Sequence, residues 1–193
     1  MSAKANDINN AIRIGERLRV LELRYPKFDL SIYGDEFQKF VNIEELFIQV
    51  DVNYKYKLPQ VIGELESLKK LHILNYPFKA FPNWVFKLRN LRNLMFRGND
   101  IQNIPTQISE LINLKHLRLE NTKLLSISDC LLSLGNLESL SLVDNFELKD
   151  ISSIKLPSGL KMIALTPSTI TKEQIENLKT KNKKLEFGKR YFK

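Results

Sequence analysis

The stretch that decides the fold is residues 91–114, LRNLMFRGNDIQNIPTQISELINL. At its start, Leu94 and Phe96 are apolar and enclose Met95, which is the period-2 pattern of a half-buried strand. The later apolar residues recur every three to four positions, at Ile101, Ile104, Ile108 and Leu111. This pattern predicts a strand, a tight turn and then short helical or 3₁₀ pieces that return the chain to its starting level.

The start of this stretch, Leu91-x-x-Leu94-x-Phe96, follows the pattern Leu-x-x-Leu-x-Leu, which is called the leucine phrase below. The leucine phrase recurs along the chain with a nearly constant spacing. Its central apolar position falls at Leu21, Leu46, Leu71, Leu94, Leu117, Leu140 and Ile163. The steps between these positions are 25, 25, 23, 23, 23 and 23 residues. A period in the twenties predicts a solenoid, in which each coil is buried by the coils before and after it. We therefore expect one cooperative domain.

With Asn99 and the pair Ile104-Pro105, the stretch resembles the leucine-rich repeat consensus LxxLxLxxNxLxxLPxxIxxLxxL. The resemblance covers almost the whole chain. It is similar to the 23-residue class of many bacterial repeat proteins and of Ras-suppressor-like intracellular proteins, and both groups remain open. The resemblance implies an α/β fold: a curved horseshoe with parallel strands on the concave face and short helical, 3₁₀ or turn segments on the convex face.

Both ends of the chain have the features of caps. We expect a single domain over 1–193, with an N-terminal cap (1–17), about seven repeats (18–170), and a C-terminal capping helix with a last strand (171–193). Asp7 is suited to cap the first helix, and Thr171 with Gln174 resembles a capping box. The last strand is expected at 185–187, with Glu186 beside Ala164.

Some repeats depart from the consensus. In the family, the turn Asn bonds to backbone groups of the neighbouring turn, and this residue is present at Asn99 and Asn145. Elsewhere the position holds Pro26, Asp51, Tyr76, Thr122 and Ser168. We therefore expect an incomplete ladder along this edge, and a bulged loop near Phe146 and Glu147, where one repeat has an extra residue.

Composition is typical of one globular domain: 43% of the 193 residues are apolar and 27% are charged. No stretch approaches the roughly 18 apolar residues that a membrane span needs. The single cysteine, Cys130, excludes an internal disulfide framework. The amino end has no apolar signal-peptide core. We expect a cytoplasmic protein, with secretion after signal removal as the open alternative.

The net charge of +8 is unevenly distributed. Residues 172–193 hold eight Lys or Arg against three Glu, so this segment supplies +5 of the total. Such a segment is suited to a solvated polar cap. The alternative is a basic end that binds an anionic polymer or a membrane surface. We expect no specific nucleic-acid binding.

The sequence gives little support for catalysis or metal binding. His72 and His116 fall on strands that are two steps apart, at a backbone distance on the order of 12 Å. Cys130 falls on a return segment, away from both histidines. The chain has no Walker loop, no HExxH and no paired CxxC. We expect no catalytic residue, no metal and no cofactor.

The outward strand positions of successive coils are predicted to form a wall on the concave face. Large apolar, Arg and His side chains gather on it, as they do in protein interfaces. The candidate partner-binding residues are Phe47, Gln49, His72, Leu74, Met95, Arg97, His116, Arg118 and Glu120. Tyr54 and Tyr56, on the loop after one strand, are candidate further contacts; the alternative is that they pack on the adjacent repeat.

The function predicted from these residues is a non-enzymatic module that binds a protein partner through its concave face. The partner's identity does not follow from the sequence, and we expect the module to be a monomer. Two other hypotheses remain: binding of an anionic surface through the basic end, and a purely structural role as a spacer or repeat.

Overall fold

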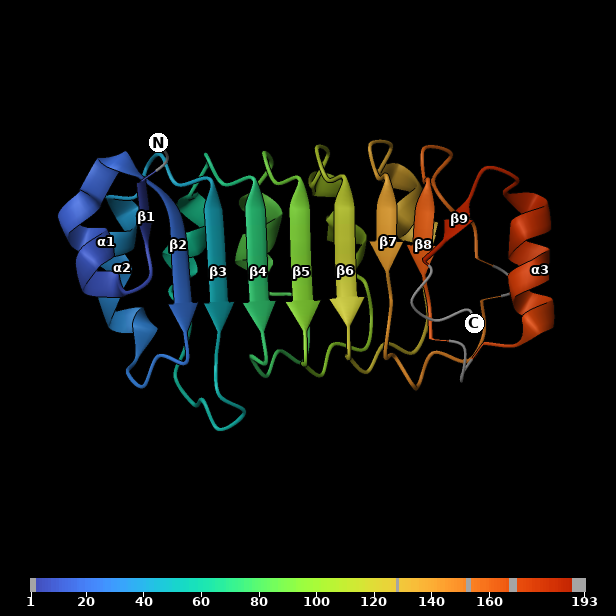
Figure 1. Cartoon of the computed structure of the whole chain (residues 1–193), viewed down its shortest axis with the longest axis horizontal. Helices are drawn as coiled ribbons and strands as arrows, with labels where there is room; N and C mark the ends of the chain where they lie inside the picture. The colour runs from blue at the N-terminus through green and yellow to red at the C-terminus, as the bar shows by residue number, and fades with distance from the viewer. Residues whose placement is uncertain (1–2, 128, 152–153, 167–169, 189–193) are drawn as a thin grey trace.

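The computed structural model describes residues 3–127, 129–151, 154–166 and 170–188. Within these residues, nine parallel strands form one sheet whose spatial order is the order of the sequence (Figure 1). The strands are β1 (Ala3–Ala5), β2 (Leu18–Arg24), β3 (Glu45–Gln49), β4 (Lys70–Leu74), β5 (Asn93–Arg97), β6 (His116–Glu120), β7 (Ser139–Ser141), β8 (Met162–Ala164) and β9 (Glu186–Phe187).

Short helical segments return the chain from the end of one strand to the start of the next. They are α1 (Ile8–Ile14), η1 (Gly15–Arg17), η2 (Leu30–Tyr33), α2 (Gly34–Gln38), η3 (Gln60–Glu64), η4 (Asn83–Lys87), η5 (Thr106–Glu110), η6 (Asp129–Ser133) and α3 (Lys172–Lys181), where η is a 3₁₀ turn. A proline stands directly before η3, η4 and η5. Its fixed φ suits the extended residue that precedes a helical turn.

The core lies between the sheet and the return segments. The seven residues at the central position of the repeated phrase are each at most 1% exposed. The return segments contribute further buried residues, among them Ile62, Val85, Ile108 and Leu131. Each coil therefore buries its apolar side chains against the neighbouring coils, as the period predicted.

The predicted register is confirmed across the middle of the sheet. Phe47 on β3 lies opposite His72 on β4, which lies opposite Met95 on β5, which lies opposite Arg118 on β6. These four side chains, from four different repeats, therefore stand on one row of the sheet.

The two ends of the sheet differ from expectation. Strand β1 was not predicted, because Ala3–Ala5 lacks the leucine pattern. Strand β9 was predicted, but its register was wrong by two residues: Glu186 lies opposite Met162, not Ala164. The reason is that Leu185 takes the place of the first leucine of the phrase. Its N–H donates to the Asn182 carbonyl, as the N–H of Leu160 donates to Pro157.

Both predicted helix caps are present. The Asp7 side chain accepts a hydrogen bond from the Asn10 N–H at 2.8 Å, where α1 begins. Thr171 and Gln174 form the capping box that opens α3. In the described part of the chain, no helix is both long enough and apolar enough to cross a membrane.

At the turn edge, the ladder of consensus asparagines is partial. Asn145 is 1% exposed and donates to the carbonyls of Leu119 and Leu142 at 2.7 and 2.9 Å, while Thr122 donates to its side-chain oxygen. Ser168 lies outside the described residues. The loop expected to bulge is a turn that leaves Phe146 exposed.

A second set of polar rungs, at the opposite edge of the sheet, was missed in the sequence. Five side chains donate to a backbone carbonyl of the preceding coil at 2.8 to 3.0 Å. They are Asn42, Ser67, Asn90, Asn113 and Asn136. Each rung ties one coil to the previous one by a hydrogen bond that does not belong to the sheet.

Candidate interaction surface on the sheet

We use the term wall for the outward strand positions of β2 to β8, on the face of the sheet away from the core. The wall has three rows. The central row is Glu22, Phe47, His72, Met95, Arg118, Ser141 and Ala164; the row near the strand starts is Val20, Glu45, Lys70, Asn93, His116, Ser139 and Met162; and the row near the strand ends is Arg24, Gln49, Leu74, Arg97 and Glu120.

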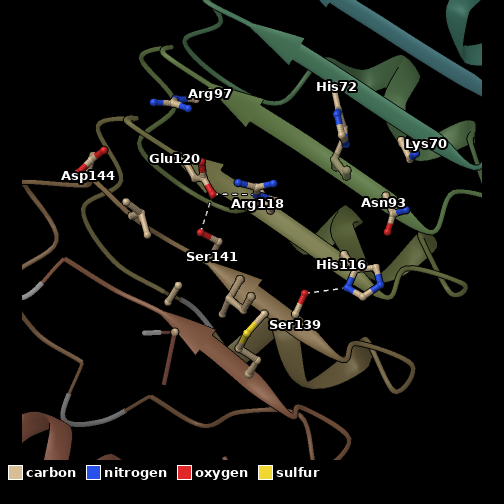
Figure 2. Close-up of a pocket in the computed structure, with 16 residues that line it drawn as sticks. Lys70, His72, Asn93, Arg97, His116, Arg118, Glu120, Ser139, Ser141 and Asp144 are labelled. Atoms are coloured by element: carbon tan, nitrogen blue, oxygen red, sulfur yellow. Dashed lines mark hydrogen bonds and ion pairs between the residues drawn. The ribbon is translucent and has the colours of Figure 1, made fainter. Parts of the chain in front are cut away.

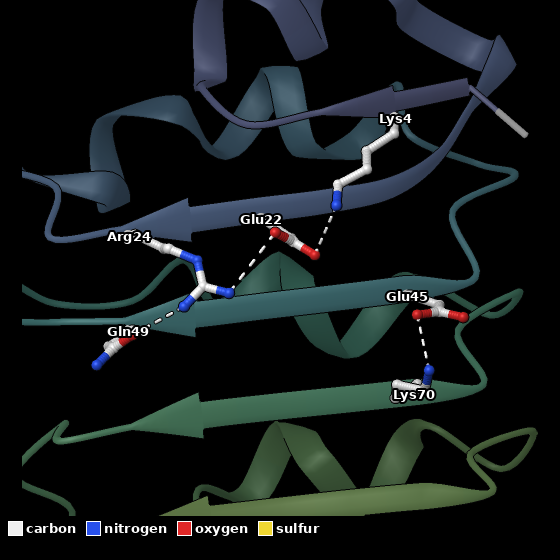
Figure 3. Close-up of polar contacts among 6 residues, drawn as sticks. All are labelled: Lys4, Glu22, Arg24, Glu45, Gln49 and Lys70. Carbon is white, nitrogen blue, oxygen red and sulfur yellow. Dashed lines mark hydrogen bonds and ion pairs between the residues drawn. The ribbon is translucent and has the colours of Figure 1, made fainter.

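The amino-terminal part of the wall is occupied by contacts within the protein (Figure 3). Glu22 pairs with Lys4 at 2.8 Å and with Arg24 at 3.8 Å. Arg24 also donates to the Gln49 side chain at 3.2 Å, and its guanidinium lies 4.4 Å from the centre of the Phe47 ring. The polar and aromatic groups of this part therefore already have partners.

Three residues that were predicted to be exposed contacts are buried: Met95, Tyr54 and Glu120. Met95 is only 6% exposed, between the long side chains of His72 and Arg118 on the adjacent strands. Tyr54 is also 6% exposed, and its hydroxyl donates to the Phe28 carbonyl and accepts from the Leu30 N–H. For Tyr54, the alternative of packing on the adjacent repeat is confirmed. Tyr56, in contrast, is 45% exposed.

The carboxyl-terminal part of the wall contains a hollow of about 600 Å³ that extends from β4 to β8 (Figure 2). The hollow follows from the sizes of the side chains. Along the central row, Arg118 is followed by Ser141 and Ala164, and Gly188 lines the hollow beside Ala164. A Cβ at Gly188 would lie 3.1 Å from the Cβ of Ala164, a tight contact that a larger residue could make only if Ala164 shifted slightly.

The floor of the hollow holds a buried carboxylate. Glu120 is 6% exposed, and its Oε1 accepts a hydrogen bond from Arg118 Nε at 2.8 Å and another from Ser141 Oγ at 2.7 Å (Figure 2). Glu120 was predicted to be an exposed contact, and that exposure is wrong. Because both partners hold Glu120, it shapes the floor and fixes Arg118.

The histidines of the wall have separate environments. His116 Nδ1 lies 2.8 Å from Ser139 Oγ, in hydrogen-bond contact across β6 and β7. His72 lies edge-on to the Phe47 ring, at 6.3 Å between centroids. Burial first, and then the nearby cations Lys70 and Arg118, lower the pKa of His72 from its ordinary 6.5 to about 4. His72 is therefore neutral at pH 7.

Two charged residues beside the hollow have no partner among the described residues. Arg97, at the end of β5, is exposed and makes no ion pair or side-chain hydrogen bond there. Asp144 follows β7 with a φ of 60°, and its N–H donates to Thr166 Oγ1 while its carboxylate makes no such contact. Figure 2 shows both side chains on the same side of the hollow as Glu120.

Comparisons with known proteins identify the fold of the chain through a solved structure. No family model matches the chain, and no curated protein matches it significantly. Among solved structures, the leucine-rich repeat protein LIC12759 of Leptospira interrogans is similar over 93% of this chain, with a TM-score of 0.56 and 20% identity. The chain has the leucine-rich repeat fold. It covers 44% of the length of the Leptospira protein, and at this identity the similarity concerns the fold alone.

Repeat solenoids present extended surfaces, and the residues on such a surface decide what it can bind. Of the nine wall residues predicted from the sequence, the hollow brings together His72, Arg97, His116, Arg118 and Glu120. It does not include Phe47, Gln49, Leu74 or Met95. It adds the small and polar residues Ser139, Ser141, Asp144, Ala164 and Gly188, which size and register together could have indicated.

The chemistry that the leucine-rich repeat wall offers is hydrogen bonding and charge pairing. Among the residues that the structure describes, no three His, Cys, Asp or Glu side chains gather to hold a metal ion. Cys130 lies on η6, on the other side of the sheet from the hollow, with its Sγ 3.6 Å from the Ile104 carbonyl. Cys130 therefore does not join the histidines of the wall.

Proposed function

We propose that this protein is a non-enzymatic interaction module that binds a protein partner through the hollow on its wall. The observation that supports this proposal is the hollow itself, about 600 Å³ in volume and extended over five strands. Four strand spacings of about 4.8 Å give a length of roughly 19 Å, which about six residues of an extended peptide would fill. This shape suits a protein segment better than a compact metabolite.

The mechanism of binding is preorganisation. The strands under the hollow are held on both sides by parallel neighbours, and the core behind them is fully buried. Arg118 is already fixed by Glu120, and His116 by Ser139. Since these groups lose little freedom on binding, modest contacts are enough to hold a partner.

The test uses one substitution in the hollow and a matched one outside it. Met162 lines the hollow and is 43% exposed, whereas Ile112 is 58% exposed and lies outside it. Met162→Glu should abolish capture of a partner from native cell extract, because it places an unpaired charge in the hollow. Ile112→Glu should capture the partner as the wild type does. Equal capture by both variants, with unchanged circular dichroism, would reject the hollow as the binding site.

The alternative function at the basic end has less support in the structure. On α3, Lys179 pairs with Glu176 at 2.8 Å, and its ammonium group lies 5.5 Å from the centre of the Phe187 ring. Residues 189–193, which carry three of the basic side chains, lie outside the described residues. That the protein is monomeric and cytoplasmic stays a prediction.

A further inference from the structure

The charges on the wall are balanced with one exception. Lys70 pairs with Glu45 at 2.8 Å, and Arg118 with Glu120 at 2.8 Å. Arg24 and Glu22, at the other end of the wall, also pair with each other. Among the charged side chains at the wall positions of β2 to β8, Arg97 is the one that forms no ion pair with a described residue. It stands at the rim of the hollow, where a bound partner would reach it.

An opposite charge stands at the same rim. Asp144 lines the hollow beyond the end of β7, and no described cation pairs with its carboxylate. Arg97 lies opposite Glu120 on β6, and Asp144 follows β7, the next strand, so the backbones of Arg97 and Asp144 are about two strand spacings apart. That separation is about 10 Å. An extended peptide that crosses the strands advances about 3.3 Å per residue, so about three residues span it.

The floor between these charges suits a peptide main chain. Ser141 and Ala164 leave little side-chain bulk above β7 and β8. The carboxylate of Glu120 is already held by Arg118 and Ser141 and needs no partner of its own. The hollow offers a polyanion little excess positive charge, because Lys70 and Arg118 are paired with Glu45 and Glu120 and the charge of Arg97 is balanced by that of Asp144.

We infer that the occupant of the hollow is an extended protein segment that crosses β5 to β7 and carries two opposite charges. An acidic side chain of the segment pairs with Arg97, and a basic side chain about three residues away pairs with Asp144. This inference rests on the proposed function, because it names the chemistry of the partner that the hollow binds. The two pairs set the direction of the segment and select it among other peptides.

The experiment is a selection from a displayed library of random nine-residue peptides on immobilised protein. Peptides selected by the wild type should be enriched in an acidic and a basic residue about three positions apart. Selection on Arg97→Glu should replace the preference for an acidic residue by one for a basic residue. Arg92→Glu is the matched control, since Arg92 is exposed on the same coil but outside the hollow, and its selected peptides should be those of the wild type.

Affinities of one selected peptide give the second readout. Arg97→Glu should weaken binding by about tenfold or more, because like charges then face each other. Asp144→Asn should weaken it several-fold, and Asn tolerates the positive φ of this position. Raising the salt concentration should weaken the wild-type complex, since exposed pairs are screened.

Two outcomes would separate this inference from the proposed function. If selected peptides lose binding to Met162→Glu but show no charge preference, the hollow binds peptides and the charge assignment is wrong. If no peptide is enriched, or if Met162→Glu, Arg97→Glu and Asp144→Asn all bind the selected peptides as the wild type does, both the proposed function and this inference are overturned.

Discussion

Arg118 and Glu120 lie two residues apart on β6, and the exposed guanidinium of the first holds the buried carboxylate of the second at 2.8 Å. Arg118→Ala would leave this carboxylate with Ser141 as its remaining side-chain partner. We expect a loss of about 1–3 kcal/mol in the free energy of unfolding, at the lower end because Arg118 faces solvent. Urea unfolding measures it. If the pair is the cause, adding Glu120→Gln should restore part of the loss; an additive double mutant would contradict it.

His72 makes stability depend on pH. Its pKa is lowered to about 4 in the folded protein by burial, against an ordinary value of 6.5. The unfolded chain therefore binds more protons between these values, and the stabilisation is present above pH 6.5 and lost as the pH falls toward 4. After a discount for solvent screening, the loss between pH 7 and 5 is on the order of 1 kcal/mol. His72→Gln should flatten this part of the profile in urea unfolding, whereas His116→Gln serves as the control.

Glu138 joins two neighbouring coils through Lys115 at 2.9 Å and Lys161 at 2.7 Å. Hydrogen bonds from Lys161 and Lys115 lower its pKa to about 2. Any stability that Glu138 contributes is fully present at pH values above its ordinary pKa of 4.5 and is lost as the pH falls toward 2. Lys161→Ala should raise the pKa of Glu138, which NMR titration of its carboxyl carbon measures. An unchanged pKa would show that Lys161 does not hold this carboxylate in solution.

Gly63 is required by the close approach of η3 to η4. A Cβ at this position would lie 2.7 Å from the carbonyl oxygen of Trp84 and 2.8 Å from its Cβ. Gly63→Ala should therefore destabilise the protein by about 1–3 kcal/mol. Gly135→Ala is the matched control, because nothing lies within 4 Å of its added methyl group, and it should be neutral or slightly stabilising. Thermal unfolding compares them, and equal melting temperatures would refute the close contact.

The polar rungs at the two edges should differ in strength. Asn145 is buried and donates to two carbonyls, whereas Asn136 is exposed and donates to one. We expect a loss of about 2–3 kcal/mol for Asn145→Ala and of about 0.5–1.5 kcal/mol for Asn136→Ala. Chemical denaturation of both variants tests this order, and a larger effect at Asn136 would contradict it.

The fold was predictable because its signal is repeated in every coil. The leucine phrase places Phe47 beside His72 and Met95 beside Arg118, and the structure has this register. The exceptions lie at the ends, where repetition fails. β1 has no leucine phrase, and at β9 Leu185 was taken for the second leucine of the phrase when it occupies the place of the first.

The site was less predictable, because exposure depends on the neighbours of a residue as well as on its row. Met95 stands on the outward row and yet is buried between longer side chains, and Glu120 is drawn into the floor by Arg118. Gly188 lines the hollow beside Ala164, and the register assigned from the sequence separated these two residues. The error of two residues at β9 therefore hid the contribution of Gly188, whereas Ser141 and Ala164 already stood side by side in the assigned register.

The edge rungs from Asn42 to Asn136 have a mechanical consequence. Each rung joins one coil to the coil before it, and none connects distant coils. Pulling on the two ends of the chain would therefore detach coils in succession from an end. Each detachment would release 23 to 25 residues, or a contour length of about 80 Å, so a force trace would show evenly spaced peaks.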